Sequence, residues 1–100
     1  MAVLVVEFYE DPRMATRDEA AVYGRLLSSV EDTSLSTTVE HVTVPGNACY
    51  ASVYSDTNCY VEIGPGNQDC GSTRRTYLPS GARYDFAVRN TDTVSYRSVA

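Results

Sequence analysis

Residues 37–63 restrict the fold most, because apolar and polar side chains alternate along two consecutive runs there. Successive side chains of a β-strand point to opposite faces, so this alternation predicts strands with one buried face. If Asp56-Thr57-Asn58 forms a three-residue hairpin loop, Ser55 lies opposite Cys59 and one face becomes wholly apolar. That face carries Cys49, Ala51, Val53, Cys59, Val61 and Ile63.

The opposite face of this expected hairpin is polar and aromatic. It carries Tyr50, Ser52, Tyr54, Tyr60 and Glu62. A two-residue loop would mix the two faces, so a three-residue loop is favoured, with Asn58 in the positive-φ position that such loops require. Tyrosine is common on contact surfaces, although it is also a good strand former. The candidate partner-binding residues on this face are Tyr50, Tyr54 and Tyr60.

The opening stretch MAVLVVEFYE predicts a strand that is apolar on both faces. One face carries Leu4, Val6 and Phe8, and the other carries Val3, Val5 and Tyr9. A small antiparallel protein has core on one face of a sheet only, so the second face needs a cover. Either the strand adds to the sheet of another chain, which makes all six residues candidate partner contacts, or it is sandwiched within its own domain. The sequence leaves both interpretations open.

Two interpretations also remain for the residues that follow Pro12, which interrupts the strand. Thr16 and Glu19 match a capping box, and Val22, Leu26 and Val30 follow at helical spacing. The same residues would also suit an extended arm that wraps over a sheet. The polar, serine-rich residues 31–38 are expected to link this region to the main sheet.

Further strands are expected at residues 39–44, 73–78, 82–89 and 93–99, with turn residues between them. The expected fold class is all-β, a small antiparallel β-sandwich or jelly-roll-like domain with an N-terminal strand or arm. Residues 1–36 would form that strand and connecting arm, and residues 37–100 would form the sandwich.

Charge and composition exclude several classes of function. The formal net charge is -5 and every basic residue is an arginine, which argues against nucleic acid as a partner and against lysine-dependent chemistry. No apolar run approaches the roughly 20 residues of a membrane span. No secretory signal pattern opens the chain as given, so we expect the protein to work in the compartment where it is made.

No catalytic, cofactor-binding or metal-binding residue is expected. His41 and Cys49 could in principle form a thiol–imidazole pair, but no local signature surrounds them. A metal site from His41, Cys59 and Cys70 would lack the usual ligand spacing. A disulfide between Cys49 and Cys59 is not expected, because about six residue positions, roughly 20 Å, separate them along the hairpin. A bridge between Cys59 and Cys70 stays open, although free thiols are favoured.

Two hairpin-like motifs, residues 53–64 and the stretch that begins at residue 77, resemble those of a known family. Val53-Tyr54-Ser55-Asp56 and Cys59-Tyr60-Val61-Glu62-Ile63-Gly64 are followed by Tyr77-Leu78-Pro79-Ser80-Gly81. Together with the opening MAVLVVEFYE, this pattern resembles small all-β virion structural proteins of tailed bacteriophages, over most of the chain. In those proteins the region of residues 12–30 looks extended, which counts against the helix.

The resemblance implies a structural subunit of the virion, assembled in the host bacterial cytoplasm and consistent with free thiols. Its expected role is that of a capsid decoration (cement) protein, which stabilises the head by binding the major capsid protein or other virion proteins. It is expected to be a homo-oligomer, with a trimer favoured. The alternatives are a neck, tail or fibre component, a carbohydrate-binding β-module that stacks sugars on Tyr54, Tyr60 and Tyr77, and a secreted β-module with a Cys59–Cys70 disulfide.

Overall fold

The computed structural model describes residues 2–10, 13–14, 21–22 and 26–100. Ten β-strands and no helix occur in these residues. One antiparallel sheet has the order β4 (Leu26–Asp32), β1 (Leu4–Tyr9), β6 (Tyr50–Ser55) and β9 (Arg83–Ala87). The second has the order β5 (Glu40–Thr43), β10 (Asp92–Ser98), β7 (Cys59–Pro65) and β8 (Thr76–Leu78). The short strands β2 (Arg13–Met14) and β3 (Ala21–Val22) pair only with each other.

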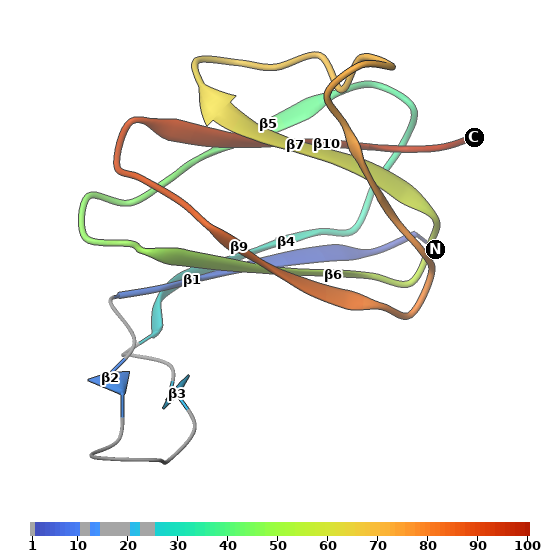
Figure 1. Cartoon of the computed structure of the whole chain (residues 1–100). Helices are drawn as coiled ribbons and strands as arrows, with labels where there is room; N and C mark the ends of the chain where they lie inside the picture. The colour runs from blue at the N-terminus through green and yellow to red at the C-terminus, as the bar shows by residue number, and fades with distance from the viewer. Residues whose placement is uncertain (1, 11–12, 15–20, 23–25) are drawn as a thin grey trace.

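The two four-stranded sheets lie face to face as the layers of a β-sandwich (Figure 1). The short pair β2–β3 can be left out and the other strands renumbered, so that β4 to β10 become strands 1 to 7 and β1 becomes strand 8. The order of the first sheet is then 1-8-3-6 and that of the second is 2-7-4-5. This is the strand order of a jelly roll, in which two Greek keys wrap around one core. The expected fold class is therefore confirmed, and the strand that closes a standard jelly roll stands first in this chain.

The core lies between the sheets and takes every second side chain from each. In the first sheet Leu4, Val6 and Phe8 of β1 are at most 1% exposed. They pack with side chains of the second sheet in a single cluster. Its fully buried members beyond β1 include Val53, Cys59, Val61, Leu78 and Val94. Burying a side chain of this size stabilises the fold by about 1.5–3 kcal/mol, so the cluster supplies the main driving force.

The predicted hairpin between residues 49–55 and 59–63 is wrong, because β6 and β7 lie in different sheets. Residues 56–58 instead cross from one sheet to the other, and both apolar faces still point into the same core. Ser55 holds this crossing, since its Oγ donates to the Val3 carbonyl at 3.1 Å and accepts from the Thr57 N–H at 3.0 Å. Asn58 does not have the predicted positive φ; in the described residues other than glycine, that conformation occurs at Cys70, with φ 54°.

The interpretation of the N-terminal strand as a free arm is also wrong. β1 pairs with β4 on one side and with β6 on the other, so both of its backbone edges are used within the chain. The sandwiched alternative describes it correctly. Because β1 and β4 make up half of the first sheet, the sandwich is not confined to residues 37–100.

The helix predicted from the spacing of Val22, Leu26 and Val30 is wrong where the chain is described. Residues 26–32 form β4, which pairs with β1 and places Val30 opposite Val6. Serine and valine are only moderate helix formers, and a short helix is stable only if it packs an apolar face, so pairing with the edge of β1 is the more stable arrangement of these residues. Thr16 and Glu19 of the capping box lie outside the described residues.

Candidate functional site

The six candidate contacts on β1 divide into buried and partly exposed residues. Leu4, Val6 and Phe8 belong to the core and cannot reach a partner while the sandwich is folded. Val3, Val5 and Tyr9 are half-buried, and the latter two lie on the outer face of the first sheet, beside Tyr54 and Tyr50 of β6.

The three tyrosines predicted to share a face lie on opposite sides of the molecule. Tyr50 and Tyr54 come from β6 in the first sheet, whereas Tyr60 comes from β7 in the second. All three are half-buried and point away from the core. The chain therefore presents two separate tyrosine surfaces in place of the single one that the hairpin would have made.

The outer face of the first sheet is organised by Arg83 of β9. Its guanidinium donates to the Glu7 carboxylate at 2.9 Å and to the Ser52 hydroxyl at 2.8 Å. The Tyr9 hydroxyl also donates to Glu7, at 3.1 Å. Burial of the Tyr9 ring and, to a lesser extent, the Glu7 carboxylate raise the pKa of Tyr9. These contacts satisfy the polar groups locally.

The outer face of the second sheet carries a stack of arginine and tyrosine side chains. The Arg75 guanidinium lies 3.6 Å from the centroid of the Tyr60 ring, and that of Arg97 lies 4.8 Å from the same centroid. Tyr77 packs at 6.0 Å from Tyr60 and is 47% exposed. Stacking on an aromatic ring keeps a guanidinium in place and leaves its N–H edge free to bind an anion.

The loop between β7 and β8 covers the rest of this outer face. Gln68 donates its N–H to the Ser95 hydroxyl at 3.1 Å, and Cys70 donates its N–H to the Glu62 carboxylate at 3.1 Å. Cys70 is fully buried under the loop. Burial, together with the nearby Glu62 carboxylate, raises the pKa of its thiol to about 11. Such a thiol stays protonated near neutral pH and is a poor nucleophile.

The residues considered for catalysis and metal binding do not come together. His41 lies on β5, where its Nδ1 is hydrogen-bonded to the Ser95 hydroxyl at 2.9 Å. Cys49 bonds through its backbone to Tyr9 and Val88, next to the first sheet. No group of three potential metal ligands occurs in the part of the chain that the structure describes. Cys49, Cys59 and Cys70 are free thiols.

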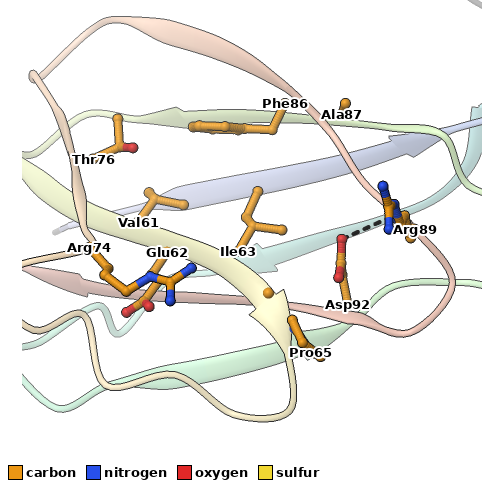
Figure 2. A pocket seen from close by; sticks show the side chains of 11 residues that line it. Val61, Glu62, Ile63, Pro65, Arg74, Thr76, Phe86, Ala87, Arg89 and Asp92 are labelled. Atoms are coloured by element: carbon orange, nitrogen blue, oxygen red, sulfur yellow. Dashed lines mark hydrogen bonds between the residues drawn. The ribbon is translucent and has the colours of Figure 1, made fainter.

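A groove of about 430 Å³ opens beside Thr76, the first residue of β8, between β7 of the second sheet and β9 of the first (Figure 2). Its apolar lining comes from Val61, Ile63 and Phe86, and Arg74 and Arg89 contribute to its rim. The sequence did not predict this groove, because it depends on the shortness of β8 and on two strands from different sheets. Its rim residues Arg74 and Arg89 form no pattern in the sequence that would indicate a groove.

No family model, curated protein or solved structure matches the chain. The described residues include no helix long and apolar enough to cross a membrane.

Proposed function

We propose that this protein is a non-enzymatic structural subunit of a tailed-phage virion, which decorates the head and stabilises it by binding neighbouring capsid proteins. The observation that carries the proposal is the jelly-roll strand order, an architecture that recurs in virus capsid proteins. The resemblance of the motifs at residues 53–64 and 77–81 points the same way. Fold alone does not determine function, so the proposal needs a direct test.

The mechanism would be mechanical. Many identical subunits each make a modest contact with the particle, and the contacts sum because every bound copy holds the next at high effective concentration. The two outer faces suit such contacts, since both carry half-buried tyrosines beside arginines. The first offers Tyr50 and Tyr54, and the second offers Tyr60 and the exposed Tyr77.

The test is to look for the chain in purified particles of the phage whose genome encodes it. Quantitative mass spectrometry should find the protein at many copies per head, and immunogold labelling with an antiserum against the chain should decorate the head shell. Labelling confined to the neck, tail or fibres would move the role there. Particles that contain no copies would overturn the proposal.

Self-association is tested separately by light scattering on the purified chain. A mass three times that of one chain is expected, because a trimer can sit on a local threefold position of a capsid lattice. A monomer at all concentrations would contradict the trimer, and the particle would then have to be bound by single subunits.

The carbohydrate-binding alternative has less support. Tyr54 lies on the opposite sheet from Tyr60 and Tyr77, so the three rings cannot form one platform for a sugar. The Tyr60 ring is also stacked by Arg75 at 3.6 Å from its centroid. Tyr77 is left as the one well-exposed ring of the three, and a glycan array with the purified chain separates this alternative from the structural one.

A further inference from the structure

We propose that copies of this chain associate edge to edge, with β4 of one copy pairing antiparallel with β9 of the next and extending the first sheet from subunit to subunit. The inference rests on the homo-oligomer of the proposed function and names the two surfaces that build it.

The backbone of β4 provides the first argument. β4 is an outermost strand of the first sheet and, among the described strands, pairs with β1 alone. The Val3 carbonyl accepts the Asp56 N–H, so the odd-numbered residues of β1 bond to β6 and the even-numbered ones bond to β4. In the register of β1 with β4, the backbone groups of Ser29 and Glu31 are therefore directed to the open edge. Such an edge is a template for strand addition.

The backbone of β9 has a matching open edge at the other side of the same sheet. The Val88 N–H donates to the Cys49 carbonyl at 3.0 Å, so Tyr84, four residues earlier, also directs its backbone groups to β6. Those of Arg83 and Ala87 are directed away from β6, to the open edge. Because β4 and β9 run in opposite directions within the sheet, β9 of one copy and β4 of the next meet as antiparallel neighbours.

Exposed apolar side chains provide the second argument. The described residues include four exposed large hydrophobic side chains, and all four lie on strands at the edges of the two sheets. Val30 of β4 is 36% exposed and Tyr84 of β9 is 37% exposed. They lie opposite Val6 and Val53, which are 0% exposed, so both point to the core side of the first sheet. A further strand at either edge would cover them.

One register satisfies both arguments. If Val30 of one copy lies opposite Tyr84 of the next, then Glu31 lies opposite Arg83, and these two are residues whose backbone groups are directed to the open edges. Opposite charges directly across a strand pair stabilise it, and no like charges face each other in this register. β4 is regular over residues 28–32, because its bulge lies beyond Ser28.

Arg83 is able to bind this second carboxylate. In the described residues its hydrogen bonds to Glu7 and Ser52 both use Nη1, and its side chain is 47% exposed. A guanidinium has five N–H donors, so those on Nε and Nη2 can reach the neighbour's Glu31.

Charge also selects which edge of the second copy is used. Residues 26–44 form β4, β5 and their connection, and they contain Glu31, Asp32 and Glu40 but no arginine. Two such sides would bring only carboxylates together, so β4 of one copy pairs better with β9 of the next than with another β4. A contact between unlike edges closes into a ring when the rotation between subunits allows it, and the trimer of the proposed function is such a ring.

The experiment is disulfide crosslinking between two variants of the full-length chain, Val30→Cys and Tyr84→Cys, of which one carries an affinity tag. In the proposed register these positions form a non-hydrogen-bonded pair, whose Cα atoms lie about 4.5 Å apart, within disulfide reach. The two variants are co-expressed, checked for native circular dichroism and oxidised with diamide. Peptide mapping distinguishes the new disulfide from any that involves a native cysteine.

The co-expressed pair should form a covalent dimer through the two introduced thiols, and neither variant alone should form one through its introduced thiol. Ala82→Cys replaces Tyr84→Cys as the register control. Position 82 lies two residues along on the same face, about 7–8 Å diagonally from position 30, and should give at least about tenfold less dimer. A link between two copies of Val30→Cys, an equal yield with Ala82→Cys, or no link in the co-expressed pair would each overturn the proposal.

Glu31→Arg tests the same contact without a thiol. It places like charges opposite each other, so self-association measured by light scattering should weaken about fivefold or more. Asp69→Arg makes the same change of charge in the exposed β7–β8 loop, away from both edges, and should weaken association less than about twofold. Equal effects of the two substitutions, or a wild-type chain that is a monomer at all concentrations, would overturn edge pairing.

Failure of these tests would leave virion decoration to other surfaces. Conversely, absence of the chain from virions would leave edge pairing in solution intact, so the two proposals can fail independently.

Discussion

Every buried side-chain nitrogen and oxygen in the described part of the chain has a hydrogen-bond partner. Ser95 is fully buried, and its hydroxyl is hydrogen-bonded to the His41 ring and accepts the Gln68 N–H. Tyr96 is 3% exposed, and its hydroxyl donates to the Asp32 carboxylate at 2.9 Å. Ser95 thus holds β5 and the β7–β8 loop to β10, whereas Tyr96 joins the two sheets, and removing one partner leaves the other unsatisfied.

The Tyr96–Asp32 hydrogen bond connects β10 to β4, which belong to opposite sheets. Tyr96→Phe keeps the ring but leaves a half-buried carboxylate without this donor, so we expect the free energy of unfolding to fall by about 1–3 kcal/mol. Urea denaturation followed by circular dichroism measures it. Tyr77→Phe, at a 47% exposed ring, is the control and should change stability by less than about 0.5 kcal/mol. Equal effects of the two substitutions would contradict this role.

Alkaline pH should destabilise the protein through its buried thiol at Cys70. Folding raises the pKa of this thiol from 9.0 to about 11, so the folded state keeps a proton that the unfolded state has lost. The resulting stabilisation is present below pH 9 and disappears as pH rises toward 11, a change of up to about 3 kcal/mol. The pKa values of Cys59 and Tyr96 are also raised, mainly by burial, and act with the same sign.

Urea titrations between pH 8 and about 11 measure this dependence. The Cys70→Ala variant is the comparison, and its free energy of unfolding should decline less steeply across the same range. If the free energy of unfolding of the variant declines with pH as steeply as that of the wild type, the Cys70 thiol has the same pKa in the folded and unfolded states.

Thiol reactivity follows from the same burial. Cys59 and Cys70 are 0% exposed, whereas Cys49 is half-buried, so Cys49 should react first with Ellman's reagent in the native protein. The other two should react only as the fold opens, because the thiolate is the reactive form and burial disfavours it. All three should titrate in denaturant without reductant. A count of one, with Cys49 identified by peptide mapping as the labelled residue, would demonstrate a Cys59–Cys70 disulfide and support the secreted alternative.

At the scale of elements, alternation in the sequence predicted which way side chains point but not which strands are neighbours. Ala51 and Val53 of β6, and Cys59 and Val61 of β7, are all buried as expected. A hairpin and a crossing between sheets both direct these side chains to the same core, so periodicity cannot distinguish the two. The Arg75–Tyr60 stack and the groove were beyond prediction for the same reason, because each depends on strand neighbours.

β1 shows the converse case, in which one pattern permitted two structures. Its apolar residues on both faces suited either a donated arm or an internal strand, and only the pairing with β4 and β6 decides between them. The outer residue Val5 lies opposite Tyr54 and is only partly exposed in the single chain. The second apolar face of β1, which the sequence predicted to need a cover, is therefore partly covered by the chain itself.

Deleting residues 1–10 should abolish folding, because β1 supplies Leu4, Val6 and Phe8 to the core and pairs with two strands. Phe8→Ala alone should cost about 3–5 kcal/mol. Circular dichroism and a thermal melt of each variant measure these effects. Val5→Thr, on the outer face of the same strand, should cost less than about 1.5 kcal/mol. A truncated chain that melts cooperatively would restore the arm interpretation.

At the scale of the whole molecule, both chain ends lie at the β6–β7 crossing (Figure 1). The Val3 carbonyl accepts the Asp56 N–H at 3.1 Å, and the Val99 N–H donates to the Asn58 carbonyl at 3.0 Å. Asp56 and Asn58 are two residues apart, which spans about 7 Å at most. The ends of β10 and β1 are thus close enough to be joined as the last two strands of a standard jelly roll.

A circular permutant should therefore fold. Residue 100 is joined to residue 1 by about four to six glycine and serine residues, and the chain is opened between Ser36 and Thr37, which are exposed and lie outside the strands. The permutant then begins at β5 and ends with β4, and we expect native circular dichroism and a cooperative melt. A chain closed with the same linker but not opened controls for strain at the new joint. If the closed chain is native and the permutant is unfolded, the connection from β4 to β5 must be continuous for folding. If both are unfolded, the chain ends are not as close as the hydrogen bonds of Val3 and Val99 require.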